Sequence, residues 1–557
     1  MPSQLKRRAL PLAAAAIAAS LLVGSAAADT PAPADPTLVA DLDAILADAR
    51  LAGAQAGVQV VDTTTGQVVY QHQADALLTP ASTMKTVTSA AALDLLGADH
   101  RFTTEVRTTG TKHGSTLVGD VVLRGGGDPS LLPQDLDDLA AQVSAAGITT
   151  VTGRVLADGS RYDSTPLGPG WAWDDEAYSY SPQISGLTVA TDTEYTMDTV
   201  KVTVTPGAAA GDDATITLFP AEAPVKPVGK ITTGAAGSGT SAGVERRRGV
   251  NELALSGSIA VGAAPASFLT TVENPADYAG KVFAGALARH GVRVVRPVAA
   301  ASGTEASQPL ASHDSKPIGE LIVPMLKISN NGLAEHLTKE LGKVKGGQGT
   351  WAAGIAQVKG FLKANGLETP AGRQVDGSGL SRYDLITPAK MTGLLKVAQD
   401  KPWFKAWYDA MPVAGNPERM VGGTLANRMR GTAAADNVHA KSGSMSGVDN
   451  LSGYATAPDG RRLAFTVMLN NFAGTSPRPV IDAIAVRLAG GHPAPAGSTP
   501  TAAPSSAPAS APASTPGVKS FGAPAARSAA TPAATEAPAS EVPGGTRWED
   551  CELFGRC

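Results

Sequence analysis

The chain has almost no cysteine. Its 557 residues contain only Cys551 and Cys557, both among the last seven. The rest of the chain can therefore hold neither a cysteine nucleophile nor a cysteine-based zinc site. In an exported protein the pair could close a small disulfide loop. The eight histidines show no HExxH or other two-ligand spacing, so we expect no metal and no cofactor.

The chain also has no large excess of charge of one sign. Lysine and arginine number 46 and aspartate and glutamate 50, a net charge of -4, which gives no reason to expect nucleic acid or a polyanion as partner. Gly125-Gly126-Gly127 lacks the Lys-Ser/Thr of a phosphate loop, and Asp376-Gly377-Ser378-Gly379 resembles a calcium loop only in its first residues. Phosphate and calcium loops are therefore excluded.

Long apolar runs are confined to the start of the chain. Lys6, Arg7 and Arg8 precede an apolar run from Ala9 to Gly24, and Ala26-Ala27-Ala28 follows. This order is typical of a signal peptide, here residues 1–28 and cleaved near Ala28; the run is too short to span a bilayer comfortably, although an N-terminal anchor is the alternative. We expect an exported, extracytoplasmic protein that associates with the cell wall and touches a membrane at most peripherally.

The hydrophobic patterns predict a mixed α/β (α+β) fold. Alternating runs indicate an antiparallel sheet, and helical spacing appears near both chain ends, so helices from both ends are expected to cover that sheet. The expected helices are 37–50, 82–96 and 477–488, and the expected strands are 56–61, 67–71, 438–443, 450–457 and 461–470.

Composition divides the chain into several parts. Residues 103–300 are rich in Val, Thr and Gly with short alternating runs, which indicates mostly β inserted domains. Segments 29–102 and 301–491 then form one domain in two pieces. Residues 492–547 are dominated by Pro, Ala, Ser and Thr and are predicted to be a disordered spacer, because such a segment cannot bury enough apolar surface to offset its ordering entropy. Residues 548–557 form a short tip with the cysteine pair.

The strongest chemical signal is Thr79-Pro80-Ala81-Ser82-Thr83-Met84-Lys85. On a helix, Ser82 and Lys85 lie on one face with Cβ atoms roughly 5–6 Å apart. The start of a helix also presents free N–H groups and a positive dipole. A neutral lysine can deprotonate a serine there for attack on a carbonyl. Ser-x-x-Lys is common by chance, however, and occurs again at Ser3 and Lys6.

A second motif, Ser329-Asn330-Asn331, interrupts the helical stretch 317–344. A second serine near the lysine can relay a proton to a leaving nitrogen, and the Asn331 amide can hold a peptide. The structural alternative is that Ser329 caps a helix.

A third motif, Lys441-Ser442-Gly443, lies on a predicted strand and is followed by Ser444. A cation with neighbouring hydroxyls suits a substrate that ends in a carboxylate. The alternative is an edge-strand lysine. Two cations close together also depress a lysine pKa, which would help Lys85 act as a base.

The three motifs in this order resemble the set of penicillin-binding proteins and serine β-lactamases, with Asn for Asp and Ser for Thr. The long insertion between the first two motifs resembles the low-molecular-mass class C penicillin-binding proteins, the D-Ala-D-Ala carboxypeptidase/endopeptidase group called peptidase S13. The resemblance covers roughly residues 37 to 490, and further matching stretches are 126–131, 170–175, 325–329, 376–382 and 441–445.

The resemblance implies a serine β-lactamase/DD-peptidase-like domain, in which helices and a helical subdomain flank the sheet, with a large mostly β insertion. It implies peptidoglycan peptides ending in D-Ala as substrates and β-lactam antibiotics as inhibitors. Ser82 resembles the nucleophile, Lys85 its base, Ser329 the proton shuttle and Asn331 a substrate-amide contact. The expected oxyanion donors are the N–H groups of Ser82 and Ser444, and Lys441 and Ser442 resemble the carboxylate end.

The same resemblance implies a pocket for the side chain of the substrate. Asp175 resembles an acid that receives the free amino group of a diaminopimelic side chain, although Asp174 is equally close in sequence. Tyr180, Leu380 and Met445 resemble the apolar wall beside it.

Two other classes of protein remain open. A β-lactamase would need a base to activate water, and we find no convincing Glu-x-x-Leu-Asn element between the motifs. A non-catalytic wall-binding protein would have no need of Ser82, Lys85 and Ser329 together. Carboxypeptidase and endopeptidase activity are not distinguished by the sequence.

Overall fold

The computed structural model describes residues 36–303, 308–368 and 371–491. The predicted signal peptide (1–28), spacer (492–547) and cysteine-containing tip (548–557) lie outside these residues.

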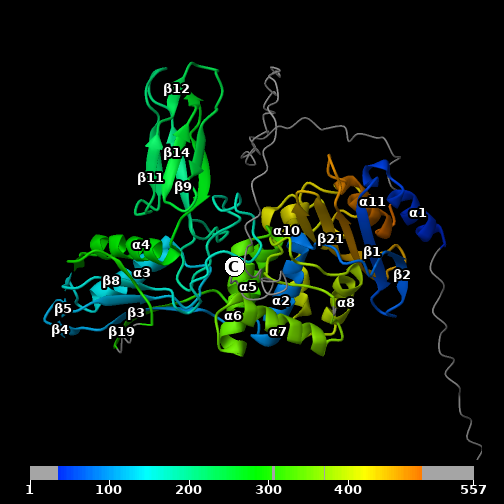
Figure 1. Cartoon of the computed structure of the whole chain (residues 1–557), viewed down its shortest axis with the longest axis horizontal. Coiled ribbons are helices and arrows are strands. Elements are labelled where there is room, and N and C mark those ends of the chain that lie inside the picture. Colours follow the sequence, from blue (N-terminus) through cyan, green and yellow to red (C-terminus); the bar gives the residue numbers. More distant parts are fainter. Residues whose placement is uncertain (1–35, 304–307, 369–370, 492–557) are drawn as a thin grey trace, which may run out of the picture. The chain divides into compact units, whose positions relative to one another are not determined.

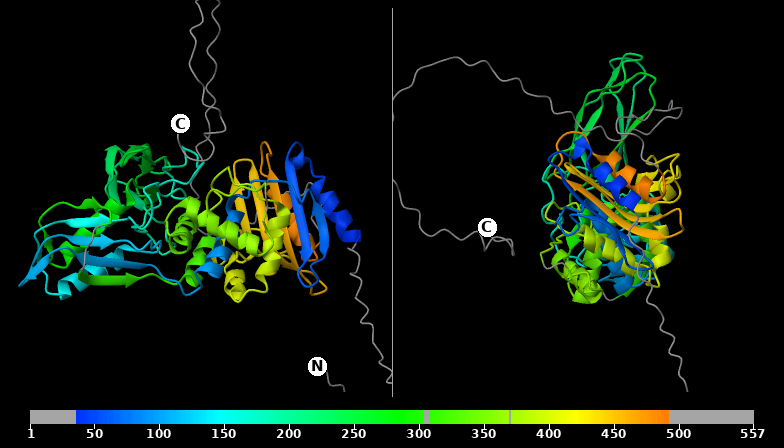
Figure 2. Two further views of the ribbon diagram at one scale, coloured as in Figure 1. Left: turned by 60° about the horizontal axis from the view of Figure 1, so that its bottom comes forward. Right: turned by 90° about the vertical axis from the view of Figure 1, so that its right-hand side faces the viewer.

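A five-stranded antiparallel sheet joins the two ends of the described chain, in the order β2-β1-β22-β21-β20. β1 pairs with β22 along its whole length, from Gln55 opposite Asn470 to Asp62 opposite Leu463. Figures 1 and 2 show the blue N-terminal strands beside the orange C-terminal ones. The strands are β1 (Gln55–Asp62), β2 (Val68–His72), β20 (His439–Met445), β21 (Val448–Thr456) and β22 (Arg462–Asn470).

Both faces of this sheet are covered, which explains why its central strands are buried almost throughout. Leu451 and Ala455 of β21 share one core with α1 (Pro36–Leu46) and α11 (Arg478–Leu488). Tyr454 points to the other face, where its hydroxyl donates to the carbonyl of Leu395 in α8 (Pro388–Ala398). The predicted mixed fold, with an antiparallel sheet covered by helices from both chain ends, is confirmed.

The second face continues into a helical part built around α2 (Met84–Leu95). Ten of its residues, from Met84 to Leu93, are buried, as expected of a helix surrounded on all sides. The predicted break at Ser329 is present, because α5 ends at Lys327 and α6 begins at Asn331. The other helices are α5 (Ile318–Lys327), α6 (Asn331–Gly346), α7 (Trp351–Ala364), α9 (Phe404–Asp409) and α10 (Arg419–Gly422), with 3-10 turns η1 (Ala49–Leu51), η2 (Ala81–Thr83) and η3 (Gly423–Leu425).

The long insertion between α2 and α5 is mostly β. Its two larger sheets have the orders β18-β8-β6-β3-β19 and β17-β7-β5-β4, and smaller sheets follow the orders β10-β9-β16, β11-β14-β13 and β12-β15. Its elements are β3 (Thr103–Thr108), β4 (Thr111–His113), β5 (Thr116–Val118), β6 (Val121–Arg124), α3 (Pro133–Ala145), β7 (Thr150–Val151), β8 (Val155–Asp158), β9 (Thr199–Thr205), β10 (Thr215–Phe219), β11 (Lys226–Gly229), β12 (Thr232–Gly234), β13 (Gly243–Arg246), β14 (Glu252–Ser256), β15 (Ser258–Ala260), β16 (Ala266–Thr271), α4 (Pro275–Arg289), β17 (Arg293–Val294), β18 (Ala299–Ala301) and β19 (Gln308–Asp314).

The inserted sheets extend past the boundary expected at residue 300. β19 pairs with β3, with Asp314 opposite Thr103. Directly beyond, the N–H of Ser315 donates to the carbonyl of Phe102 at 2.9 Å, so the chain leaves and returns at neighbouring points. β19 has one buried residue, Ala311, and such a strand carries almost no hydrophobic pattern. The division into domains itself stays a prediction.

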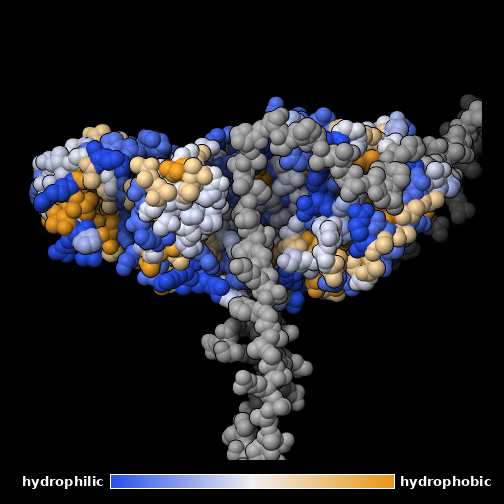
Figure 3. Space-filling view, turned by 90° about the horizontal axis from the view of Figure 1, so that it is seen from above, coloured by the Kyte–Doolittle hydropathy of each residue, from blue (hydrophilic) through white to orange (hydrophobic). Residues whose placement is uncertain are grey.

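The described surface is of mixed polarity. The face in Figure 3 shows hydrophilic residues in blue with small orange groups of hydrophobic ones among them. Within residues 36–303, 308–368 and 371–491, no helix has the length and apolar character to cross a bilayer.

Candidate active site

Ser82 lies in η2, the 3-10 turn that leads directly into α2. Two contacts hold this turn: the Thr83 hydroxyl donates to the carbonyl of Pro80 at 2.7 Å, and the side-chain amide of Asn450, on β21, donates to the same carbonyl at 2.7 Å. Ser82 stays partly exposed, whereas Lys85, one turn later, is completely buried. The sheet thus positions a serine that is open to solvent over a lysine that is not.

Lys85 has three polar partners. Its Nζ lies 2.9 Å from the Ser82 hydroxyl, 2.5 Å from Oδ1 of Asn331 and 2.9 Å from the carbonyl of Ser378. Asn331 and Ser378 present acceptors only, so they take two N–H bonds. A neutral amine has two N–H bonds and one lone pair. When Lys85 is neutral, its lone pair therefore faces the Ser82 hydroxyl, which becomes the donor.

The charge state of Lys85 fits this arrangement. Burial lowers its pKa to about 7, against the opposing influence of the Glu335 and Asp376 carboxylates. The sequence led us to expect a second cation as the cause of such a shift, but at Lys85 the cause is burial. A second cation does act at Lys441, where burial first and the charge of Lys85 second hold the pKa well below its ordinary value.

Ser329 lies in the break between α5 and α6 with a φ of 63°, a strained conformation for a residue that is not glycine. Its hydroxyl accepts a hydrogen bond from Nζ of Lys441 at 2.9 Å. The capping role considered for Ser329 belongs to Asn330, whose side chain accepts from the N–H of Leu333 at 3.1 Å. The Ser329 hydroxyl is therefore directed at the site rather than at the helix end.

Asn331 links Lys85 to the insertion. Its Oδ1 accepts from Lys85, and its Nδ2 donates to the carbonyl of Tyr180 at 2.8 Å. Both ends of the amide are thus bonded to protein groups in this structure.

The Lys441 motif occupies β20, which is the edge strand of the sheet. Lys441 is completely buried, and its Nζ also donates to the carbonyl of Ser442 at 2.6 Å. The Ser442 hydroxyl bonds to that of Thr424 at 2.7 Å, whereas the Ser444 hydroxyl donates to the carboxylate of Asp449. Lys441 and Ser442 therefore share the site with Ser329 and Thr424. The side chain of Ser444 is bonded to Asp449 instead.

The backbone of β20 packs against the turn that carries Ser82. A Cβ added to Gly443 would lie 2.7 Å from the carbonyl oxygen of Pro80 and 3.0 Å from the nitrogen of Ser82, so only glycine permits this approach. The N–H of Ala440 points away from β21, to the outer edge of the sheet, where it donates to the carbonyl of Pro412. Alternate residues of a strand share that direction, which directs the N–H of Ser444 toward the same edge.

Asp175 and Tyr180 come together on the inserted segment 171–180. The Tyr180 hydroxyl donates to Oδ1 of Asp175 at 2.7 Å, and its ring stacks on Tyr178 with centroids 5.4 Å apart. Burial and the Asp175 carboxylate raise the pKa of Tyr180. Of the two neighbouring acids, Asp175 is the one bonded to Tyr180.

Leu380 and Met445 lie on two segments that a hydrogen bond of Arg382 connects. Leu380 belongs to the turn 376–381, and Met445 ends β20. The guanidinium of Arg382 donates to the carbonyl of Ser446 at 3.2 Å. Both predicted wall residues are partly exposed.

Sequence reasoning missed three buried carboxylates beneath the site, Glu335, Asp376 and Asp384. Their acceptor oxygens hold the turn whose Ser378 carbonyl contacts Lys85. The sequence Asp376-Gly377-Ser378-Gly379 could have indicated a turn held by its own side chains, because Asp and Ser side chains accept from backbone N–H groups in tight turns. Glu335 and Asp384 carried no signal of their own.

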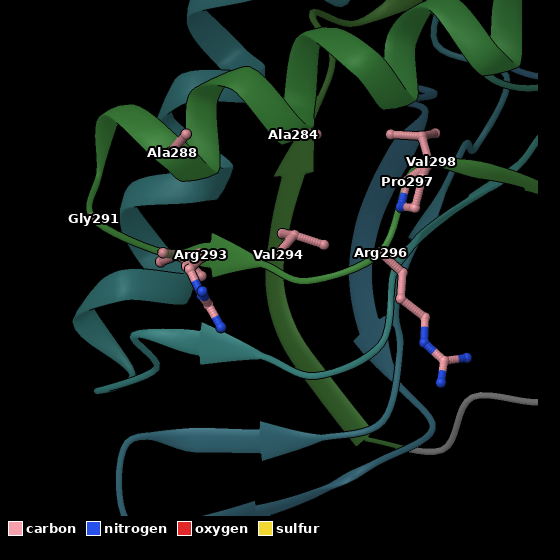
Figure 4. A pocket seen from close by; sticks show the side chains of 9 residues that line it. Ala284, Ala288, Gly291, Arg293, Val294, Arg296, Pro297 and Val298 are labelled. Atoms are coloured by element: carbon pink, nitrogen blue, oxygen red, sulfur yellow. The ribbon is translucent and has the colours of Figure 1, made fainter.

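A separate hollow of 510 Å³ lies on the insertion (Figure 4). It runs between α4 and the segment from Gly291 to Val298. None of the predicted site residues lines it, and its lining is apolar apart from Arg293 and Arg296. We assign it no part in the chemistry.

Comparison with known proteins gives one consistent result. A sequence model of the D-Ala-D-Ala carboxypeptidase 3 (S13) family matches residues 38–490. The chain is 45% identical over 463 residues to a D-alanyl-D-alanine carboxypeptidase of Actinomadura sp., covering 82% of this chain and 86% of that protein. It is 29% identical over 512 residues to carboxypeptidase DacB of Mycolicibacterium smegmatis, covering 85% and 93% of the two chains. The fold is similar to that of penicillin-binding protein 4 of Haemophilus influenzae, with a TM-score of 0.69, 24% identity and coverage of 80% and 98%.

Proposed function

The chain belongs to the D-Ala-D-Ala carboxypeptidase 3 (S13) family and is a serine-type D-Ala-D-Ala carboxypeptidase; from that premise we propose that it works through an acyl-enzyme on Ser82. The observation that carries this assignment is the contact of Ser82 with a buried lysine whose other partners are both acceptors. This geometry leaves one lone pair of neutral Lys85 for the hydroxyl proton of Ser82.

In the acylation step, Lys85 takes the proton of Ser82, and Oγ forms a bond to the carbonyl carbon of the penultimate D-Ala. The N–H groups of Ser82 and Ser444 stabilise the oxyanion, and one such donor is worth roughly 3–4 kcal/mol in related hydrolases. The peptide C–N bond then breaks. Ser329 gives its own proton to the departing amine and takes one from Lys441, which donates to it. Water then attacks the ester carbonyl, its proton returns through Ser329 to Lys441, and Lys85 returns its proton to Ser82 as the C–O bond of the ester breaks.

The ends of the substrate have separate contacts in this proposal. Lys441 and Ser442 hold the terminal carboxylate by charge and hydroxyl, and Thr424 orients the Ser442 hydroxyl. Asn331 contacts the substrate amide and keeps Lys85 in place.

The inserted segment selects the side chain. Asp175 receives a free amino group at the end of that side chain, because a carboxylate forms a charge-assisted hydrogen bond with an ammonium group. Tyr180, Leu380 and Met445 form the apolar wall. Peptidoglycan peptides that end in D-Ala and carry a diamino acid fit these contacts, and β-lactams that mimic the peptide end acylate Ser82.

The signal-peptide pattern of residues 1–28 supports export. We therefore place the enzyme outside the cytoplasmic membrane, in association with the cell wall.

Fluorescent penicillin tests the proposal on the purified protein. We expect a stable covalent label that Ser82→Ala abolishes, while Ser446→Ala, an exposed serine in the neighbouring hairpin turn, keeps it. Rapid release of hydrolysed penicillin would identify a β-lactamase instead. A folded protein that no β-lactam labels would overturn the acyl-enzyme proposal.

Release of D-Ala from a pentapeptide, compared with cleavage of cross-linked muropeptides, then separates carboxypeptidase from endopeptidase activity.

A further inference from the structure

The turn 376–381 is held by side chains rather than by a strand or helix. The N–H groups of Gly377 and Ser378 donate to Glu335 at 2.9 and 2.8 Å. Those of Gly379 and Ser381 both donate to Asp376 at 2.7 Å. Two buried carboxylates therefore set the position of this turn.

The same turn is fixed against the nucleophile. Its Ser378 carbonyl accepts from Lys85, and a Cβ added to Gly379 would lie 1.9 Å from the carbonyl oxygen of Ala81. The φ of Gly379 is 77°, which also favours glycine. The turn thus has no freedom to shift relative to Ser82.

Trp171 attaches the insertion to this turn. Its indole Nε1 donates to Oδ2 of Asp376 at 2.9 Å, the oxygen that Ser381 also uses. Its ring packs edge-on against Trp351 with centroids 6.4 Å apart. The first residue of segment 171–180 is therefore bonded to the carboxylate that shapes the active-site turn.

The other end of that segment is attached as well, because the Tyr180 carbonyl accepts from Asn331. Both attachment points, Asp376 and Asn331, lead directly to Lys85, one through the Ser378 turn and one through its own side chain. Between them lies Asp175.

Residues just after Asp175 are held by the insertion itself, because Glu176 accepts from Arg246 and the carbonyl of Ala177 accepts from the N–H of Thr271. The bonds of Trp171 and Tyr180 tie this part of the insertion, with Asp175, to the active-site turn and to Asn331.

We propose that Trp171 is a positioning residue for substrate selection, whose indole N–H, bonded to Asp376, sets the place of Asp175 relative to Ser82. The inference rests on the proposed role of Asp175 and adds to it the residue that makes the pocket selective. Loss of the N–H bond releases residues 171–175 from the active-site turn, although Glu176 and Ala177 stay bonded to the insertion, while Ser82 and Lys85 keep their own contacts.

The test uses Trp171→Phe, which keeps an aromatic ring against Trp351 and removes the N–H. The substrates are two D-Ala-D-Ala peptides that differ only in whether the amine of the side chain is free or acetylated. We expect the variant to lose roughly tenfold in kcat/KM for the free-amine peptide, in line with one lost bond to a charged group. The value for the acetylated peptide and the acylation rate with benzylpenicillin should stay within about twofold, since neither uses Asp175.

Trp351→Phe is the matched control. The indole N–H of Trp351 donates to Glu335 at 2.7 Å, so the variant loses an equivalent bond at the same turn but keeps both an aromatic ring against Trp171 and the bond of Trp171 to Asp376. We expect it to keep the free-amine preference of the wild type, whatever happens to its overall rate.

The outcomes separate the two claims. If wild-type enzyme shows no preference for the free amine, the role of Asp175 fails and the inference fails with it. If the wild type has the preference and Trp171→Phe keeps it, Asp175 stands and the inference is overturned. If Trp171→Phe slows benzylpenicillin as much as the peptide, Trp171 supports the catalytic centre in general, and the inference is again overturned.

Discussion

At the scale of the residue, the proposed mechanism makes the reaction depend on the protonation state of the buried Lys85 amine. Burial lowers its pKa to about 7, and only the neutral form has a lone pair for Ser82. We expect the rate of acylation by penicillin to rise with pH, about tenfold per unit below pH 7, and to level off above it. Labelling rates from pH 5 to 8.5 would measure this profile.

The control for that profile is Lys85→Arg, which keeps a positive charge but does not deprotonate in this range. It should label very slowly at every pH. A flat wild-type profile, or a fast Lys85→Arg variant, would contradict the assignment of Lys85 as base.

The buried acid Asp384 leads to a second prediction at this scale, about how the stability of the fold depends on pH. Burial, and then the neighbouring Asp376 carboxylate, raise the pKa of Asp384 well above its ordinary value. A carboxyl group with a raised pKa in the folded state stabilises the fold fully below its unfolded pKa, near 4, and this stability is lost as the pH rises through the folded pKa. Asparagine mimics the protonated acid without titrating, and its carbonyl still accepts from the N–H of Val375.

We therefore expect the melting temperature of Asp384→Asn to rise relative to that of the wild type as the pH is raised from 5 to 8. Asp400→Asn, at an exposed site, serves as control and should differ from the wild type by the same amount throughout. A difference between Asp384→Asn and the wild type that stays constant or shrinks would show that Asp384 is ionised in the fold.

At the scale of the element, β20 and η2 depend on each other through Gly443. Gly443→Ala places a Cβ 2.7 Å from the carbonyl oxygen of Pro80, and a backbone atom cannot yield as a side chain would. β20 must move away from η2, which separates the N–H groups of Ser82 and Ser444. We expect penicillin acylation to fall about 100-fold, the effect of losing one oxyanion donor, with a melting temperature that shows an intact fold.

The matched substitution is Gly360→Ala on α7, where an added Cβ meets nothing within 4 Å. It should leave acylation unchanged. Unchanged acylation in Gly443→Ala would mean that β20 does not supply an oxyanion donor.

The elements differ in how far the sequence could predict them. The hairpin of β1 and β2 and the strands β21 and β22 were predictable because hydrophobic residues mark buried strands. β19 was not, since one buried residue leaves no pattern. The turn 376–381 was not predicted for a different reason: besides Asp376, it is held by Glu335, which is distant in sequence and belongs to no motif.

The site residues show the same limit. Motif spacing was enough to single out Ser82, Lys85, Ser329 and Lys441, because helix and strand geometry relate residues that are close in sequence. Contacts between distant segments, such as Asn331 with Tyr180 and Trp171 with Asp376, follow only from the folded chain.

At the scale of the whole molecule, the insertion and the helical part share buried contacts. Ala190, Tyr195 and Met197 of the insertion belong to the same hydrophobic core as α2 and α5. A buried ion pair adds to this: Glu340 on α6 is completely buried and accepts two bonds from Arg161 of the insertion, at 2.5 and 2.8 Å. The two parts should therefore unfold together.

Arg161→Met tests that coupling. Burial alone would raise the pKa of Glu340, but the hydrogen bonds of His100 and Arg161 hold it below its ordinary value, so the carboxylate is charged in the fold. Removing Arg161 leaves this charge buried with weaker partners, which costs about 3 kcal/mol for a broken buried pair. Chemical denaturation should show that loss in a single cooperative transition.

The double variant Arg161→Met with Glu340→Gln should recover most of that stability. A neutral glutamine needs hydrogen bonds but no counter-charge, and the hydroxyl of Tyr162 at 3.2 Å and the ring of His100 at 3.0 Å remain as its partners. Recovery would identify the uncompensated charge as the cause of the loss. If the double variant is as unstable as Arg161→Met, the arginine acts through its packing instead; and if unfolding occurs in two steps, the insertion folds on its own and the shared core does not couple the two parts.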